Sequence, residues 1–327
     1  MALIKCPSCG SMISDKAEEC PRCGAPRMRQ PQPPVQPQQP VQPETPIYQK
    51  RNESSKVLYV LIGVLAAAVL GLGGFLAWKS GLFGGTDNKT IAEQEKKTLD
   101  PVIQNLINNM VTVEGGTFTM GATPEQGVCD KDEYPSHQVT LSSFCIGKYE
   151  VTQEEWRAVM GTNPASFQGD KCPVEFVSWN DCLEFIEKLN SLTEMKFRMP
   201  TEAEWEFAAR GGNISRGYQF AGSNILNSVG WHSGNSGGRT KEVGMKSPNE
   251  LGLYDMTGNL WEWCSDWYGS YNGSSQTNPT GPENGTSRVL RGGGWNGGAK
   301  NCRISNRDGR LPDYSSDRLG LRLVISK

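Results

Sequence analysis

Residues 57–78, VLYVLIGVLAAAVLGLGGFLAW, carry no charged side chain, and this run constrains the fold more than any other feature. A helix of this length, rising about 1.5 Å per residue, crosses the hydrocarbon core of a bilayer. Tyr59 and Trp78 lie near its ends, where aromatic rings favour the membrane interface. A cleaved signal peptide is disfavoured because a cysteine-rich module and a long linker precede the run. The sequence therefore predicts one transmembrane helix over residues 57–78.

Four cysteines before this helix form two Cys-x-x-Cys pairs, CPSCG and CPRCG: Cys6, Cys9, Cys20 and Cys23. Two such pairs can place four thiolates tetrahedrally around Zn²⁺, and the glycine after each pair allows a tight turn. So short a module buries little core, so metal binding would supply its folding free energy. A pair of disulfides is the alternative. We predict a zinc ribbon over residues 1–26, which resembles modules at the N-termini of many bacterial membrane proteins.

Two observations place the zinc ribbon on the cytoplasmic side of the membrane. Zinc-binding thiolates require a reducing compartment. Basic residues near the apolar run are also slightly more numerous on its N-terminal side: Lys50, Arg51 and Lys56 precede it, and Lys79 and Lys89 follow it. We therefore expect a single-pass protein of the cell membrane with a cytoplasmic N-terminus and an extracytoplasmic C-terminal domain.

The segments on either side of the apolar run have different character. Residues 27–56 are rich in proline and glutamine, which favours an extended linker. Residues 79–110 are expected to form a stalk, since apolar side chains up to Met110 recur at helical spacing. Pro101 interrupts the pattern, which would divide the stalk into two short helices. Its apolar face is expected to pack on the domain that follows.

Residues 111–327 are long enough for one sizeable core, and their pattern predicts an α+β domain rich in irregular loops. Three segments have helix start signals: VTQEEWRAVMG with Thr152 and Glu155, VSWNDCLEFIEKLN with Ser178, and PTEAEWEFAARGG with Thr201 and Glu204. The segment VEGGTFTMG predicts a short hairpin with a glycine turn. After Gly211 the helix signals give way to short strands and turns.

Such loops require stabilisation, and the sequence offers two sources. Six cysteines lie in the domain expected outside the cytoplasm: Cys129, Cys145, Cys172, Cys182, Cys264 and Cys302. Six cysteines allow fifteen pairings, so the disulfide connectivity stays open. The other source is a cation, because Asp255 and Glu262 flank a TGN turn and Ca²⁺ prefers carboxylate and backbone oxygens. By spacing alone, these acids could equally cap helices or pair with arginine.

Four motifs in order, PTEAEWEFAARGG, PNELGLYDMTGNLWEWCSDW, RVLRGGGW and LGLRL, resemble the formylglycine-generating enzyme (sulfatase-modifying factor) family. The resemblance covers essentially all of residues 111–327. It implies a C-type-lectin-like fold with little regular secondary structure. Catalytic members oxidise a sulfatase cysteine to formylglycine, using O₂ and copper held by two cysteines. The related iron sulfoxide synthases need three histidines in a separate helical domain, whereas this chain has two histidines and no such domain.

The family's calcium loop matches LYDMTGNLWE. On that match Asp255 and Glu262 offer side chains, and Gly258 and Leu260 offer backbone carbonyls, so the resemblance implies calcium in the large domain. The family's second calcium loop would fall near WHSGNSGGRT. Its acids are missing there, so no second site is expected.

The family's copper loop matches GGGWNGGAKNC, residues 292–302. Its serine position is Gly294, its aromatic is Trp295, its first cysteine position is Gly297 and its second is Cys302. One thiolate of the pair is therefore absent, and the sequence between Trp295 and Cys302 has no replacement soft ligand. Intact copper binding is therefore not expected. A structural disulfide between Cys264 and Cys302 is favoured instead.

Two functions follow from these features. The first is a binding or structural role: a calcium-stabilised, lectin-like domain without a redox centre, which displays a loop surface to a protein or glycan ligand. The alternative is a copper- and O₂-dependent oxidase that converts a protein cysteine to formylglycine, with Cys302 as its catalytic residue. A third hypothesis has a ligand outside reported to the zinc ribbon inside. A net charge of −2 gives no reason to expect nucleic acid, and the oligomeric state stays open.

Two further expectations concern side chains near the motifs. The aromatic run Trp261, Trp263, Trp267 and Tyr268 is expected in the core rather than on a ligand-binding surface. The C-terminal segment from Arg288 has an excess of basic residues. Arg303 and Arg322 are expected to pair internally with carboxylates such as Glu262 or Asp266.

Overall fold

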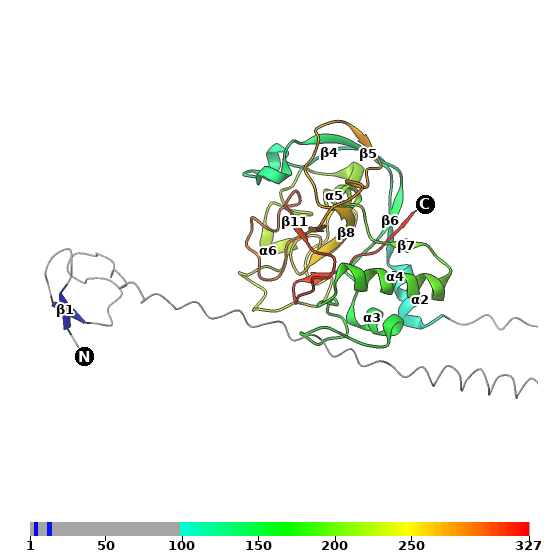
Figure 1. Ribbon diagram of the computed structural model, residues 1–327, viewed down its shortest axis with the longest axis horizontal. Helices are drawn as coiled ribbons and strands as arrows, with labels where there is room; N and C mark the ends of the chain where they lie inside the picture. The colour runs from blue at the N-terminus through cyan, green and yellow to red at the C-terminus, as the bar shows by residue number, and fades with distance from the viewer. Residues whose placement is uncertain (1–2, 6–11, 15–98, 327) are drawn as a thin grey trace, which may run out of the picture. The chain divides into compact units, whose positions relative to one another are not determined.

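The computed structural model describes residues 3–5, 12–14 and 99–326 (Figure 1). The chain divides into two units, Met1–Ala92 and Glu93–Lys327. In the first unit, strand β1 (Leu3–Lys5) pairs antiparallel with β2 (Met12–Ser14). The four predicted zinc ligands, the linker, the predicted transmembrane helix and most of the stalk lie outside the described residues. Within the described ranges, no helix combines the length and apolar character needed to cross a bilayer.

The second unit has few helices, and most of them are short. They are α2 (Pro101–Asn108), α3 (Gln153–Met160), α4 (Trp179–Thr193), α5 (Glu202–Ala209) and α6 (Leu226–Val229), with single 3₁₀ turns η1 (Pro124–Gln126), η2 (Lys131–Glu133) and η3 (Gly212–Ile214). Helices α2, α3 and α4 lie together at one end of the unit, and α5 lies beside β8 (Figure 1).

Three small sheets make up the rest of this unit. Their strands are β3 (Met110–Val113), β4 (Gly116–Met120), β5 (His137–Leu141), β6 (Phe144–Gly147), β7 (Phe197–Arg198), β8 (Trp261–Trp267), β9 (Gln276–Thr277), β10 (Arg288–Arg291), β11 (Arg307–Arg310), β12 (Leu319–Gly320) and β13 (Val324–Ser326). The strand orders are β11-β10-β8-β12, β3-β6-β13-β7 and β4-β5-β9. The chain between the strands is mostly irregular, which agrees with the loop-rich α+β prediction.

Local capping chemistry sets the starts of α3, α4 and α5, as predicted. Thr152, Ser178 and Thr201 each accept a hydrogen bond from the main-chain N–H three residues later, and an acidic side chain there bonds back to the cap. Each box satisfies N–H groups that have no partner within the helix. Helix α3 ends at Gly161, whose left-handed conformation (φ 77°) suits glycine.

The core has two main clusters. One surrounds α5 and contains Trp205 and Phe207, and the other lies under α3 and α4, where the rings of Trp156 and Phe185 stack 4.8 Å apart. Helix α4 buries the predicted face: Cys182, Phe185, Ile186 and Leu189. Trp263 is fully buried, as expected for the aromatic run, while Trp261 and Trp267 are half-buried.

Two sequence expectations differ from the structure in this region. The stalk was expected to run to residue 110, but Met110 begins β3. The apolar face of its last helix packs on the domain as expected, since α2 buries Ile103 and Leu106 in the core. Pro101 begins α2, because the first helical position needs no N–H donor, and the piece expected before it lies outside the described residues. The strands β3 and β4 do not form the predicted hairpin. β3 pairs with β6 and β4 with β5, so the glycines between them lead the chain from one sheet to another.

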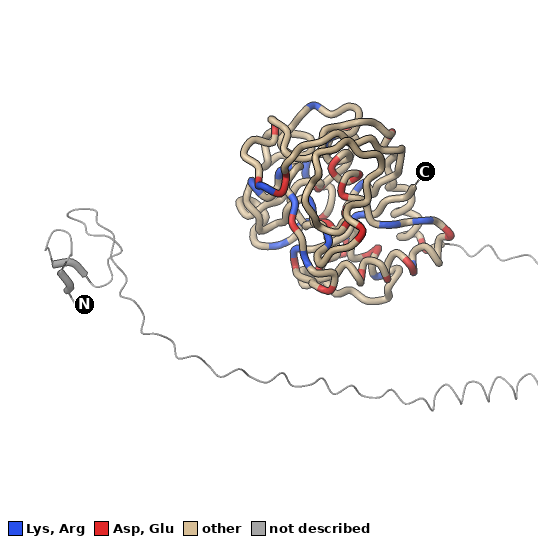
Figure 2. Tube along the Cα trace, turned by 45° about the horizontal axis from the view of Figure 1, so that its top comes forward, with Lys and Arg blue, Asp and Glu red and all other residues tan. Residues whose placement is uncertain are grey.

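Buried ion pairs hold the loops to this framework. Glu202 and Glu206 of α5 pair with arginines from three separate segments: Arg210, Arg291 and Arg307. Figure 2 shows basic and acidic segments lying beside one another within the fold. Most of these side chains are nearly inaccessible to solvent, so removing one member would leave a buried charge without compensation.

Candidate functional site

The loop from Gly292 to Cys302 follows β10 and packs on the turn that contains Gly258. The N–H of Gly258 donates to the carbonyl of Gly292 at 2.8 Å, and the N–H of Trp295 donates to the carbonyl of Asn259 at 2.7 Å. Gly292 and Gly293 adopt left-handed conformations (φ 97° and 76°). The predicted copper loop and the predicted calcium loop are therefore one connected structure.

Cys302 is fully buried at the end of this loop. It packs in a small apolar cluster with Phe220 and Val229, and burial raises the pKa of its thiol to about 12. A Cβ atom at Gly297 would meet the carbonyl oxygen of Gly294 and the side chain of Asn301, with no sulfur among its nearest neighbours. Two-coordinate copper needs a second soft ligand. The residues present therefore do not fit the family's copper site.

The predicted disulfides are not formed. Cys264 belongs to the cluster around α5 rather than to that of Cys302, and both are free thiols. The other four cysteines of the described domain are free as well. Arginine–carboxylate ion pairs hold the loops instead. Such internal pairs were predicted for only two arginines, Arg303 and Arg322.

The side chains of the predicted calcium set have different partners. Asp255 is buried in a left-handed conformation (φ 57°), and its Oδ2 accepts a hydrogen bond from the N–H of Gly244 at 2.7 Å. Its Oδ1 is buried and has no hydrogen-bond partner in the described part of the chain. Glu262, by contrast, accepts from the guanidinium of Arg322 and from Trp205 Nε1. The predicted Arg322–Glu262 pair is thus confirmed, whereas Arg303 pairs with Glu133.

Sequence reasoning missed Glu150, which completes this cluster of carboxylates. Its oxygens accept hydrogen bonds from the N–H of Leu260 at 3.0 Å and from Asn259 Nδ2 at 2.6 Å. Burial, reinforced by Asp255 and Glu262, raises the pKa of Glu150 well above its usual range. Glu150 precedes a helix cap and is far from the motif in the chain, so no local signal identified it.

The cluster therefore has fewer positive than negative charges. Burial raises the pKa of Asp255 to about 6, and Arg322 is the guanidinium nearest to all three carboxylates. Asp255, with its free buried oxygen, and Glu150 fit a hard cation. Glu262 is committed to Arg322, and no three acidic, histidine or cysteine side chains among the described residues already form a metal-binding group. The main-chain N–H groups of Gly258 and Leu260 donate to the carbonyl of Gly292 and to Glu150. The calcium prediction uses the carbonyl oxygens of the same two residues.

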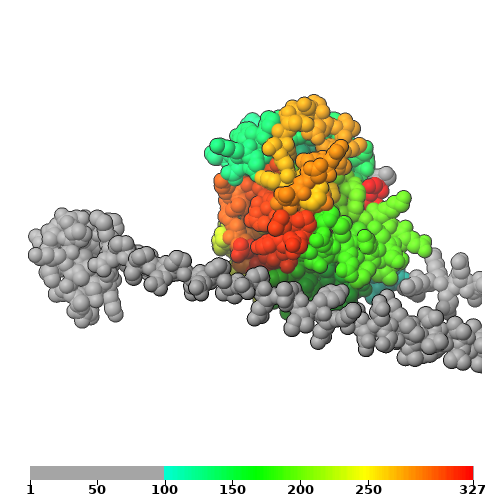
Figure 3. All heavy atoms as spheres, in the orientation of Figure 1, coloured from blue at the N-terminus to red at the C-terminus, as the bar shows by residue number. Residues whose placement is uncertain are grey.

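A groove of about 250 Å³ borders the same loop. Asn296, Gly297 and Asn301 line it from the loop, and Asp308, Arg310, Tyr314 and Arg318 line it from the C-terminal segment. In Figure 3 the orange-to-red atoms of the C-terminal segment lie on the face turned toward the viewer. Trp295 joins the loop to the C-terminal segment, since its Nε1 donates to the carbonyl of Asp317 at 2.8 Å.

Fold and loop together define the class: a loop-rich α+β domain of the sulfatase-modifying type that lacks one of the two copper cysteines. The chain belongs to the family of the sulfatase-modifying factor enzyme 1-like domain, whose model matches residues 95–327. A zinc-ribbon domain model matches residues 5–27.

Three relatives illustrate this membership. The chain is 34% identical to the chaperone protein LppX of Paenibacillus barcinonensis over 275 residues, which cover 67% of this chain and 90% of that protein. It is 28% identical to the formylglycine-generating enzyme of Thermomonospora curvata, over 67% of this chain and 94% of the enzyme. The solved structure of Treponema denticola variable protein 1 superposes with a TM-score of 0.62 at 33% identity, covering 67% of this chain and 95% of that one.

Proposed function

We propose that this chain is a non-catalytic member of its family, whose large domain binds a protein ligand at the groove beside the Gly292–Cys302 loop. One observation carries the proposal. Of the two positions that match the family's cysteine pair, one is Gly297 and the other is Cys302, whose thiol is fully buried. Oxidation of a substrate cysteine through this loop would need an accessible thiolate and a second soft ligand. Neither is supplied by the loop, which is nevertheless held to the domain by hydrogen bonds at Gly292 and Trp295.

The chemistry of the groove supports a protein ligand. Arg310 and Arg318 are about half exposed there, and Tyr314 and the adjacent Leu311 expose 45% and 56% of their surface. Aromatic and arginine side chains together are typical of protein-binding hot spots. The name of the Paenibacillus relative, a chaperone protein, also fits a protein ligand.

The membrane arrangement is part of the same proposal. Residues 57–78 would anchor the chain in the cell membrane, with the zinc ribbon in the cytoplasm and the binding domain outside. Zinc would be held by Cys6, Cys9, Cys20 and Cys23, and the match of a zinc-ribbon model to residues 5–27 supports this. The prediction is one zinc per chain, lost when Cys20→Ser is introduced.

Calcium would stabilise the loop rather than take part in chemistry. Asp255 and Glu150 would hold it with the carbonyls of Gly258 and Leu260. The full-length chain should then be more stable in calcium than in chelator. At a calcium concentration a hundredfold above Kd, its unfolding free energy should rise by about 2.7 kcal/mol and its melting temperature should rise with it. Glu150→Gln should remove the difference. Glu175→Gln, which changes a buried carboxylate in a different loop, should preserve it.

Crosslinking tests the ligand and oxygen consumption tests the alternative. A photoreactive amino acid at Tyr314 should form an adduct with protein in cells, whereas one at Leu192, exposed on α4, should not. Loss of the Tyr314 adduct in Arg318→Ala would support the groove. An adduct that consists of glycan would reassign the ligand class. Stoichiometric Cu(I) uptake with O₂ consumption in the presence of a cysteine-containing sulfatase peptide would refute the non-catalytic proposal.

A further inference from the structure

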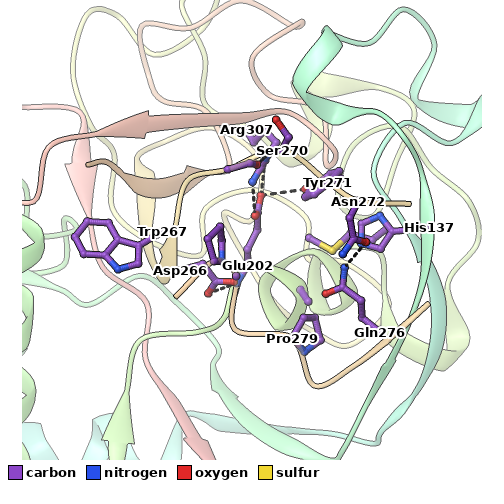
Figure 4. A pocket seen from close by; sticks show the side chains of 15 residues that line it. His137, Glu202, Asp266, Trp267, Ser270, Tyr271, Asn272, Gln276, Pro279 and Arg307 are labelled. Carbon is purple, nitrogen blue, oxygen red and sulfur yellow. Dashed lines mark hydrogen bonds and ion pairs between the residues drawn. The ribbon is translucent and has the colours of Figure 1, made fainter. Parts of the chain in front are cut away.

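A second cavity, of about 200 Å³, lies at the start of α5, away from the residues of the groove (Figure 4). Asp266 and Glu202 form one side of it. His137, Asn272 and Gln276 lie on the opposite side, and Tyr271 lies between them. This volume is below the range of drug-sized pockets, roughly 300–1,000 Å³, so a small ligand or a single side chain is the size that fits.

The side-chain donors of Arg307, Tyr271 and Gln276 in this cavity are already engaged. Arg307 donates to Glu202 through two nitrogens at 2.5 and 2.7 Å and to the carbonyl of Gly269 at 2.7 Å. Tyr271 donates its hydroxyl hydrogen to Glu202 at 3.1 Å. The amide nitrogen of Gln276 donates to Asn272 at 3.2 Å.

Acceptors, by contrast, remain free. Asp266 Oδ2 accepts from the N–H of Glu202 at 3.0 Å and from the hydroxyl of Ser265 at 2.9 Å, while no donor in the described domain reaches Asp266 Oδ1. Gln276 Oε1 likewise has no donor among the described residues. A ligand that brings several donors would complement these two free acceptors.

The charge around Asp266 points to a cation. Its side chain is 97% buried, and the carboxylates nearest to it are those of Glu202 and Glu204. Burial, together with Glu202, raises the pKa of Asp266 to about 7. Arg291 and Arg307 are paired with Glu202. Arg288 is stacked between Trp179 and Trp267 and forms no ion pair with Asp266 in the described domain, although the Asp266 carboxylate is near enough to favour the charged form of Arg288.

A purely structural role uses only half of Asp266. Oδ2 alone satisfies the first N–H of α5, so capping leaves Oδ1 of this cavity-lining residue without a hydrogen-bond partner in the described domain. The loop at Gly281 (φ 74°) approaches so closely that a Cβ there would lie 2.9 Å from Asp266 Cβ. The same Cβ would lie 3.2 Å from Asp266 Oδ1, so the backbone of Gly281 packs against the carboxyl group, and both residues line the cavity.

We propose that this cavity binds the primary ammonium group of a small organic amine or of a lysine side chain, with Asp266 Oδ1 as counter-ion and Gln276 Oε1 as a second acceptor. A primary ammonium group offers three donors and one positive charge, which match the free acceptors and the missing charge. A neutral polyol would supply donors without the charge. A quaternary ammonium group would supply charge without N–H donors.

Calorimetric titration of the full-length chain at about pH 8, where the Asp266 carboxyl is ionised, tests the proposal. The probes are ethanolamine and Nα-acetyl-lysine amide, compared with ethylene glycol and choline. Either primary amine should bind at millimolar concentration, more tightly than both comparison probes. Saturation by ethanolamine would assign the site to free amines, and saturation only by the lysine derivative would assign it to peptides.

Two variants and one control separate recognition from folding. Asp266→Asn keeps an acceptor for the α5 N–H and should weaken amine binding about tenfold. Gln276→Met, which leaves Asp266 intact, should weaken it by a smaller factor. Asp170→Asn, an exposed acid elsewhere, should leave binding unchanged. Equal affinity in wild type and Asp266→Asn, equal affinity for ethylene glycol or choline, or no saturable binding of either amine would overturn the proposal.

Discussion

The buried ion pair between Arg303 and Glu133 offers the sharpest test of what holds the loops together. Arg303 donates to both oxygens of Glu133 at 2.6 and 2.7 Å, and both side chains are almost completely buried. The exposed pair Arg157–Asp170 has the same 2.6 Å contact, but 44% and 68% of its side-chain surface is accessible. The two pairs therefore share one contact distance and differ in burial.

Burial predicts very different costs for breaking the two pairs. Glu133→Gln leaves a guanidinium buried without its counter-charge, which should cost about 3–5 kcal/mol of unfolding free energy. Asp170→Asn breaks a solvated pair and should cost about 0–1 kcal/mol. The pH dependence gives a second figure. Although burial opposes ionisation, the hydrogen bonds from Arg303 and Ser305 lower the pKa of Glu133 from 4.5 to about 2.

Because the pKa of Glu133 is lower in the folded state, its contribution is complete above about pH 4.5 and is lost as pH falls toward 2. The whole contribution is about 3 kcal/mol, of which about 2 kcal/mol should be gone by pH 3. Glu133→Gln lacks this titration. The difference in unfolding free energy between wild type and variant should therefore shrink by about 2 kcal/mol between pH 6 and pH 3.

Urea denaturation of the full-length chain, followed by tryptophan fluorescence, measures these values. All tryptophans except Trp78 lie in the described domain, so the signal reports mainly on this unit. Equal costs for Glu133→Gln and Asp170→Asn at neutral pH would refute the argument from burial. A wild-type-to-variant difference that stays constant down to pH 3 would refute the argument from the pKa of Glu133.

Three further predictions concern Cys302, Gly293 and Thr201. The Cys302 thiol should resist alkylation in the folded chain and react after denaturation, as mass spectrometry would show; rapid native labelling would contradict its burial. Gly293→Ala should destabilise by about 1–3 kcal/mol, since its φ is 76° and a Cβ would lie 2.7 Å from the carbonyl of Asn301; an unchanged melting temperature would contradict this. Thr201→Ala removes the hydroxyl that accepts from the N–H of Glu204 and should cost about 1 kcal/mol in urea denaturation, against no change for Thr201→Ser.

Helices α3, α4 and α5 were predictable because their signals are local, whereas α6 (Leu226–Val229) lies after Gly211, where no helix was expected. A capping box places donor and acceptor three residues apart. Helix starts can therefore be predicted without tertiary information at Thr152, Ser178 and Thr201. The hairpin around Gly115 was wrong for the opposite reason. Its two strands choose partners in different sheets, and such long-range pairing leaves no trace in a nine-residue segment.

The same distinction between local signals and long-range contacts applies to the candidate site. The loop glycines, Cys302 and Asp255 follow from motif order, and the pair Arg322–Glu262 was anticipated. Glu150 was missed, and Arg303 was assigned to the wrong carboxylates, because both contacts join segments more than a hundred residues apart. The expected disulfide of Cys264 failed because each thiol fills its own apolar cluster, which sequence spacing cannot reveal.

The loop from Gly292 to Cys302 is attached independently at both ends. Its first residue is bonded to Gly258, and its last is buried against Phe220. Between them, a Cβ at Gly298 would meet nothing within 4 Å. Lineages of this protein could therefore insert residues at Gly298 while keeping the contacts of Gly297 with Ser233 and of Lys300 with Asp130, because the entropy cost of a longer loop grows only slowly with its length. The same attachment would let a protein engineer use the tip to present foreign peptides.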